Sequence, residues 1–327
     1  MRAIPYEEWL ELGDGAKARF LNVGHILGSA MIELHVSSGG KETRLVFSGD
    51  VGRYGVPLHS DPVAPPACDF LVVESTYGNR AHDHRPLKTQ LSGPIKKTFD
   101  RGGIVLIPSF AVGRAQLVTL ILRELMNAGE LPNVPIHIDS PMAVDATRIY
   151  SHHLKDDSLD ENLSEDGRSR LFPSNVKFHR TVEQSKALNE LPGPRIIISA
   201  SGMLTAGRVL HHLRRLLPEQ RNLVLLVGYQ AAGTRGRALL EGARTLKVHG
   251  KRVPVRARFQ SLQGLSAHAD ADELLRWLGS LEKPPRRIFV THGEPEASQA
   301  LARRIEDQLP ARCVVPRLHD DFDLSSL

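Results

Sequence analysis

The spacing of apolar and polar positions near the start of the chain predicts strands. Two apolar runs with partial alternation, "GSAMIELHVSS" (28–38) and "ETRLVFSGD" (42–50), lie on either side of "GGKE", which is typical of a hairpin turn. A third run, "CDFLVVEST" (68–76), predicts another strand, and no long helical period separates the three. Residues from about 18 to 80 are therefore expected to be rich in β-structure.

The middle of the chain changes to an alternation of short apolar runs and helical periods. This order occurs in 102–129, 194–218 and 222–242, and more weakly in 132–150. Short β-branched runs followed by amphipathic periods predict βα units in a mostly parallel sheet. The polar, poorly periodic segment 151–176 is expected to be a surface excursion, and strand–loop–helix patterns return in 255–281 and 285–309.

Composition narrows the class of protein. The 327 residues are 41% hydrophobic and 24% charged, which is ordinary for a soluble globular protein. No apolar run reaches the roughly 18 residues of a membrane span, and residues 1–15 lack the apolar core of a secretion signal. Cys68 and Cys313, the two cysteines, form no disulfide framework. We expect a cytoplasmic protein without a membrane partner.

Charge and loop composition suggest a polyanionic partner. The formal net charge is +5, which is compatible with nucleic acid as well as with a merely arginine-rich surface. Loops at the predicted carboxyl ends of the middle strands are rich in Gly and Ser and carry Arg114, Arg208, Arg235 and Arg237. Arginines and backbone N–H groups at helix starts suit phosphate, although the same glycines and serines also make tight turns and N-caps. Both interpretations remain open at this level.

Five side chains able to bind metal or transfer protons follow predicted strands. They are His25, Asp50, Glu74, His268 and His292. Imidazole and carboxylate are zinc ligands, and strand ends of an α/β scaffold bring such groups together. A single histidine at a strand end is commonly a surface or capping group, so the prediction depends on all five together.

These five positions lie in short motifs that resemble the metallo-β-lactamase fold, and specifically its β-CASP branch of RNA-processing ribonucleases, which includes the cleavage and polyadenylation endonuclease. The motifs occur in the order of that branch: "GHILGSA" with His25, "FSGDVGR" with Asp50, "VVESTYGNR" with Glu74, "LSAHAD" with His268 and "VTHGE" with His292. The resemblance extends over the chain from about Ile4, and the middle α/β segment is similar to the β-CASP cap.

The resemblance implies a fold and a set of roles. The fold would be α/β: an incomplete metallo-β-lactamase αββα core in 1–82 and 255–327, with a parallel-sheet β-CASP cap inserted as 83–254. The activity would be that of a two-zinc RNA phosphodiesterase. His25 would bind one zinc and His292 the other, with Asp50 bridging, while Glu74 orients His268 as the acid for the leaving oxygen. Ser266 and the cap arginines would hold the RNA backbone.

One expected motif does not occur. The branch's His-x-His-x-Asp-His motif should precede "GHILGSA", but no histidine precedes His25, and "AHDHRP" (81–86) has the wrong position and spacing. The chain therefore resembles a family member that lacks its N-terminal part, and we expect it to be inactive or weakly active by itself. Two alternatives are a non-catalytic RNA-binding scaffold, and one half of a split enzyme whose exposed core edge binds a complementing chain or a second copy.

Other enzyme classes lack support. The sequence contains no G-x-x-x-x-G-K-[ST] phosphate loop, no G-x-S-x-G elbow and no G-x-G-x-x-G after a strand. A small-molecule hydrolase could use the same fold, but the cap motifs favour RNA.

Overall fold

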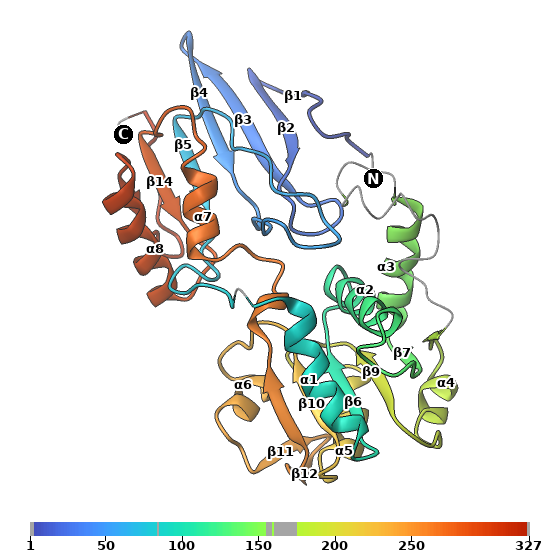
Figure 1. The fold of residues 1–327 in the computed structure, drawn as a ribbon. Helices are drawn as coiled ribbons and strands as arrows, with labels where there is room; N and C mark the ends of the chain where they lie inside the picture. The colour runs from blue at the N-terminus through green and yellow to red at the C-terminus, as the bar shows by residue number, and fades with distance from the viewer. Residues whose placement is uncertain (1–2, 84, 155–158, 160–174, 326–327) are drawn as a thin grey trace. The chain divides into compact units, whose positions relative to one another are not determined.

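The computed structural model describes residues 3–83, 85–154, 159 and 175–325. The chain forms two compact units, one made of residues 1–82 and 267–327, the other of residues 83–266 (Figure 1). We call them the core unit and the cap unit and describe each by itself. Most of the predicted surface excursion, 155–158 and 160–174, lies outside the described residues. None of the described helices has the length and apolar character needed to cross a membrane.

The core unit is built on a seven-stranded sheet in the order β1-β2-β3-β4-β5-β14-β15. The first four strands are antiparallel, including the predicted hairpin, whereas the pairs β4–β5, β5–β14 and β14–β15 are parallel. The strands are β1 (Leu10–Gly13), β2 (Ala16–Asn22), β3 (Ala30–Ser38), β4 (Lys41–Phe47), β5 (Phe70–Val73), β14 (Arg287–Val290) and β15 (Cys313–Val314).

Two amphipathic helices, α7 (Ala271–Leu278) and α8 (Pro295–Gln308), bury their apolar faces against this sheet. Trp277 of α7 is fully buried, and its indole N–H donates to the carbonyl of Val63 at 2.8 Å. Asp270 caps α7 by accepting from the backbone of Asp272 and Glu273, and Glu273 completes a capping box. The helix start is thereby fixed, three residues after His268.

The cap unit contains a six-stranded, fully parallel sheet in the order β13-β10-β6-β9-β7-β8. The four predicted strand–helix units are confirmed as β6–α2, β7–α3, β9–α5 and β10–α6. The strands are β6 (Ile104–Pro108), β7 (Ile136–Ile138), β8 (Val176–Phe178), β9 (Arg195–Ser199), β10 (Leu223–Leu226) and β13 (Arg258–Ser261), with a separate hairpin of β11 (Thr245–Val248) and β12 (Lys251–Pro254).

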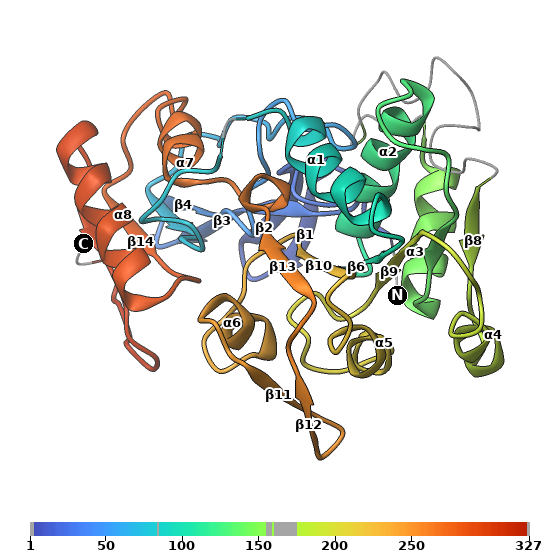
Figure 2. The same ribbon diagram turned by 60° about the horizontal axis from the view of Figure 1, so that its bottom comes forward.

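Helices cover both faces of the cap sheet, as parallel sheets require (Figure 2). One apolar cluster joins α5, α6 and the β11–β12 hairpin to the central strands, while α1 and α2 lie on the opposite face. The helices are α1 (Leu87–Phe99), α2 (Arg114–Asn127), α3 (Pro141–His152), α4 (Val182–Ala187), α5 (Val209–Leu216) and α6 (Arg235–Leu240), followed by the 3₁₀ turn η2 (Gln263–Leu265).

The last strand of the cap sheet lies beyond residue 254. β13 pairs in parallel with β10, so residues 258–261 pack with the cap unit, and the chain enters the core unit at Ala267. The family domain boundaries that we expect at 82/83 and 254/255 stay a prediction.

Candidate metal and acid–base site

The topology of the core sheet explains why the candidate residues meet. β2, β4, β5 and β14 all run in the same direction, because β4 is parallel to β5, β5 to β14, and β3 is antiparallel to both β2 and β4. Their carboxyl ends therefore lie on one edge of the sheet. His25, Asp50, Glu74 and His292 each follow one of these ends within three residues.

The loops that carry His25 and Asp50 touch backbone to backbone. Gly52 donates its N–H to the carbonyl of Val23 at 2.8 Å, and a Cβ on Gly52 would lie 2.1 Å from the carbonyl oxygen of Gly24. Gly24 itself has φ +69°. Only glycine allows this approach, so the backbone determines how far apart the two side chains begin.

The carboxylate of Asp50 divides its two oxygens between two histidines. Oδ2 lies 3.8 Å from His25 Nε2, and Oδ1 lies 3.3 Å from His292 Nδ1. The three side chains differ in exposure, from 12% for His25 to 40% for Asp50 and 60% for His292. One carboxylate thus lies close to two histidines, one at each of its oxygens.

His292 takes a left-handed backbone conformation with φ +51°. Thr76 holds it there, since its hydroxyl lies 3.2 Å from the His292 carbonyl and 3.3 Å from Nδ1. The next residue, Gly293, packs so tightly against Ser75 that a Cβ would meet its Oγ at 2.3 Å. The "THGE" sequence is therefore shaped to present an exposed imidazole.

The buried carboxylate of Glu74 pairs with the partly exposed imidazole of His268. His268 Nδ1 lies 3.0 and 3.2 Å from the two oxygens of Glu74, which is 2% exposed. The same carboxylate accepts from the backbone N–H groups of Val51 at 2.7 Å and Thr76 at 3.2 Å. Burial alone raises the pKa of Glu74, but these hydrogen bonds, led by that from His268, hold it below its ordinary value. Glu74 is thus an ionised acceptor that orients the His268 ring.

The imidazole of His268 also lies beside the candidate metal ligands. Its ring centroid is 4.4 Å from that of His25 and 6.0 Å from that of His292. Burial, followed by the neighbouring His268, lowers the pKa of His25 to about 4. His25 is therefore neutral at neutral pH, which is the form that binds metal.

The donor atoms fit zinc in type and spacing. Two groups, His25–Asp50–His268 and Asp50–Glu74–His292, each bring three donor atoms within 4.8 Å of one another. Two ligands of a tetrahedral zinc at about 2.0–2.1 Å lie roughly 3.3–3.4 Å apart, close to the 3.3 Å between Asp50 and His292. Since Glu74 already accepts from Val51, Thr76 and His268, the expected set of His25, Asp50 and His292 stays a prediction that this geometry allows.

The comparison with protein families agrees with this geometry. Residues 115–239 match the Beta-Casp domain, and residues 252–316 match the Zn-dependent metallo-hydrolase RNA specificity domain. Ribonuclease TTHA0252 of Thermus thermophilus is 38% identical over 93% of this chain and 68% of its own length. The chain belongs to the β-CASP family of metallo-β-lactamase-fold proteins.

Two other relatives extend the comparison. An RNase J-like protein of Methanocaldococcus jannaschii is 35% identical over 97% of this chain and 73% of its own length. The transcription termination factor FttA of Methanosarcina mazei is 32% identical over 94% of this chain, which spans about half (49%) of that factor. The expected fold class, an α/β β-CASP cap with a metallo-β-lactamase core, is confirmed.

His82 is a site residue that sequence reasoning missed. We considered it only as part of a displaced metal motif, in which His84 lies outside the described residues. In this β-CASP protein the His82 ring is 3% exposed, and its Nε2 lies 2.9 Å from the carbonyl oxygen of His268. Its backbone N–H donates to Asp270 at 2.7 Å, and its ring lies 4.6 Å from that of Tyr77. His82 therefore holds the backbone of His268, and its position shortly after Glu74 was the available signal.

A third cluster of possible ligands, His82–Asp270–Glu273, has a structural explanation. Asp270 and Glu273 form the capping box of α7, and Glu273 also pairs with Arg53 at 3.1 Å. These carboxylates are engaged by the protein itself.

The cap arginines have structural partners within the cap unit. Arg114 is buried and donates to the carbonyl of Leu265 at 3.0 Å, next to Ser266, which is fully buried. Arg208 donates to Asp139 at 2.8 Å and to the carbonyl of Arg180 at 2.7 Å.

The two arginines of α6 differ in their hydrogen-bond partners. Arg235 donates to the carbonyls of Lys247, Leu204 and Thr205, at 2.6, 3.1 and 3.1 Å. Arg237 pairs with Glu241 one helical turn away, and its side chain is 42% exposed. RNA contact by Ser266 and these four arginines stays a prediction.

Proposed function

We propose that this protein carries the site of a zinc-dependent, RNA-cleaving phosphodiesterase of the β-CASP type. The observation that carries the proposal is the division of the Asp50 carboxylate between His25 and His292, beside the Glu74–His268 pair. A bridging carboxylate next to an oriented imidazole suits phosphodiester hydrolysis, in which the charge on phosphate must be neutralised and the leaving oxygen protonated.

Each side chain then has one role. His25 and Asp50 would hold one zinc ion, and Asp50 and His292 the other. Bound zinc supplies the Lewis acidity that neutralises phosphate charge and lowers the pKa of water. Because Glu74 accepts the hydrogen bond from Nδ1 of His268, the other ring nitrogen, Nε2, is the one that would donate a proton to the leaving oxygen.

RNA is the substrate that the comparisons favour. One matched domain is described as an RNA specificity domain, and two relatives are named a ribonuclease and an RNase J-like protein. The net charge of +5 agrees with a polyanionic substrate.

The ligand count predicts weak activity of this chain alone. The 327 residues contain no His-x-His-x-Asp-His motif, so His25, Asp50 and His292 are shared between two ions. A catalytic zinc usually has three protein ligands. We therefore expect weak zinc binding and slow cleavage, increased by a complementing chain or a second copy that supplies further ligands. The edge strand β1, with Leu12 54% exposed, is the place where we would look for such a contact.

The first test is zinc binding, measured by titration calorimetry and by metal content after gel filtration. We expect Asp50→Ala to lose zinc binding at both positions and to abolish cleavage of a fluorescent single-stranded RNA in added zinc. Glu11→Ala removes an exposed carboxylate outside the site and is the matched control. Unchanged zinc binding by Asp50→Ala would overturn the ligand assignment, and equal cleavage by the two variants would indicate a contaminating nuclease.

A further inference from the structure

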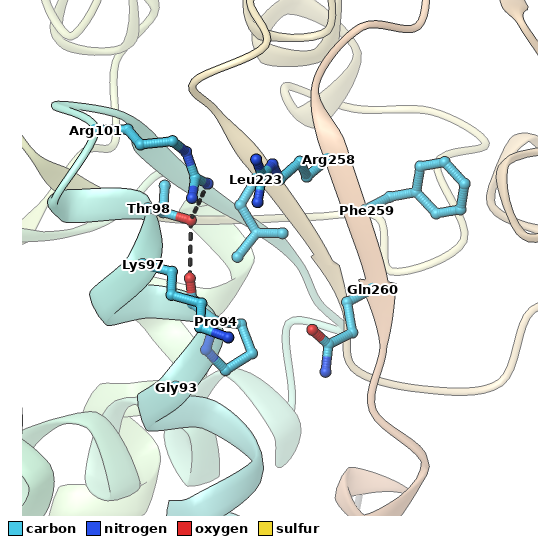
Figure 3. A pocket seen from close by; sticks show the side chains of 9 residues that line it. All are labelled: Gly93, Pro94, Lys97, Thr98, Arg101, Leu223, Arg258, Phe259 and Gln260. Carbon is cyan, nitrogen blue, oxygen red and sulfur yellow. Dashed lines mark hydrogen bonds between the residues drawn. The ribbon is translucent and has the colours of Figure 1, made fainter.

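A pocket of about 420 Å³ opens on the cap unit, apart from the loops that carry the predicted phosphate contacts (Figure 3). It lies between the second half of α1 and the first residues of β10 and β13, at the amino ends of these parallel strands. The nine lining residues are Gly93, Pro94, Lys97, Thr98, Arg101, Leu223, Arg258, Phe259 and Gln260. A volume of several hundred Å³ is that of a small-ligand site.

The lining is cationic and has no counter-charge. Lys97, Arg101 and Arg258 contribute three positive side chains, and none of the nine residues is acidic. Within the described part of the chain, none of these three cations forms an ion pair. Three cations around one concave site produce a positive potential that favours an anion.

Arg101 is held in a way that leaves hydrogen-bonding capacity unused. Its Nη2 donates to the hydroxyl of Thr98 at 3.2 Å, and that hydroxyl donates in turn to the carbonyl of Pro94 at 2.8 Å. The Nε of Arg101 is buried and has no hydrogen-bond partner. A buried donor without a partner costs free energy, which a phosphate oxygen could recover.

The strand β13 supplies the other wall. It is the edge strand of the cap sheet, and it places Arg258 and Gln260 on one side and the 37%-exposed ring of Phe259 on the other (Figure 3). The ring of Phe259 thus points away from the two polar side chains, and Arg258 and Gln260 form the wall that faces α1. Lys97 lies in the last turn of α1, where a positive charge interacts favourably with the helix dipole, so its presence there needs no ligand. Arg258 belongs to a strand and has no such explanation.

We propose that this pocket binds phosphate groups of the RNA strand, as a contact separate from the metal site. The proposal rests on the proposed function only in taking RNA as the ligand. Lys97 and Arg258 would contact phosphate oxygens, and Arg101 would support them. Such a contact strengthens RNA binding without taking part in cleavage.

The test measures binding of a fluorescent single-stranded RNA by anisotropy, with EDTA present so that no metal-dependent cleavage occurs. The variant is Lys97→Glu with Arg258→Glu, two exposed positions whose exchange leaves the buried apolar groups of the cap intact. We expect the dissociation constant to increase about tenfold or more. The slope of log K against log salt should fall by about 1.4, since each phosphate contact contributes roughly 0.7 for single strands.

The matched control is Lys251→Glu with Arg252→Glu, which makes the same charge change at two exposed positions of β12 outside the pocket. Equal losses in both variants would show a general charge effect and overturn the pocket, as would unchanged affinity of the pocket variant. The proposed function fails by a different result. In that case the chain would bind RNA through the pocket but would neither bind zinc nor cleave RNA. Thermal unfolding of each variant checks that it is folded.

Discussion

Two carboxylate–histidine pairs, one in each unit, invite comparison because their chemistry is the same and their surroundings differ. In the core unit His268 lies 3.0 Å from Glu74, and in the cap unit His212 lies 2.7 Å from Asp139. Both carboxylates are almost completely buried, at 2% and 0% exposed. By distance and burial alone, either pair could be an acid–base centre.

The partners of the carboxylate separate the two pairs. Asp139 also accepts from the guanidinium of Arg208 at 2.8 Å and from the hydroxyl of Ser185 at 2.6 Å, and the His212 side chain is 4% exposed. Burial alone raises the pKa of Asp139, but the hydrogen bonds, led by that from His212, hold it below its ordinary value. The cap pair is thus a closed network that ties β7, α4 and α5 together.

The core pair, in contrast, has an open side. The His268 side chain is 18% exposed, and its ring lies beside those of His25 and His292. A histidine that one carboxylate orients and that still reaches a candidate ligand cluster can transfer a proton, whereas one enclosed by its own network stabilises the fold. The exposure of the histidine to a reacting group, rather than its pairing with a carboxylate, therefore separates a candidate catalytic pair from a structural one.

Replacing the two histidines should give the largest difference. We expect His268→Ala to lower the RNA cleavage rate by about 10²- to 10⁴-fold, the usual contribution of general acid catalysis, while zinc binding is retained. His212→Ala should leave the rate per folded molecule unchanged. Loss of zinc from His268→Ala would instead make His268 a ligand, as its grouping with His25 and Asp50 permits.

Replacing the cap carboxylate should affect stability strongly. Asp139→Ala leaves the Arg208 guanidinium without its buried partner, and removing one member of such a pair costs about 3–5 kcal/mol. Thermal or urea unfolding measures the loss, and Asp139→Asn should recover part of it by accepting some of the same hydrogen bonds. A near-wild-type unfolding midpoint for Asp139→Ala would mean that the network is not structural.

Acidification should lower the stability of the cap unit gradually, and by less than the replacement of Asp139. Burial, then the charge of His179, lowers the pKa of His137 to about 4, and burial lowers that of His179 as well. The unfolded chain therefore binds more protons than the folded chain below pH 6.5. This contribution is fully present above pH 6.5 and is lost as the pH falls from 6.5 through about 4.

Unfolding free energies measured across that range check the expectation, and His137→Leu should flatten the pH dependence. His25 and His59 of the core unit also have pKa values lowered to about 4 by burial, so part of the dependence remains in that variant. An unchanged slope would show that His137 is protonated equally in the folded and unfolded chains.

The sequence predicted the core site better than the cap contacts. His25, Asp50, Glu74 and His292 could be foreseen because each follows a strand, and the direction of those strands brings their ends together. The partners of Arg208 and Arg235 could not, since they are carbonyl oxygens and a carboxylate from loops that no local pattern relates to these arginines.

One helix was not predicted at all. We assigned no element to residues 87–99, and the structure has α1 there, continuing through Gly93 and Pro94. Leu91, Ile95 and Phe99 are buried at helical spacing, so tertiary packing outweighs the cost of the proline. The β11–β12 hairpin was missed as well, because its strands are short and half exposed.

The contact between Gly24 and Gly52 has a consequence for metal selectivity. Since the main chains of the two loops touch, the backbone positions from which His25 and Asp50 extend are fixed relative to each other, and a side chain at Gly52 would force the two loops apart. Donor groups on loops held in this way would need little backbone reorganisation to bind a small ion, and they would adapt less readily to larger ions that need longer bonds and more ligands. The preference for one cation over another would then depend on the main-chain contact between the two loops as well as on the atoms that bind the ion.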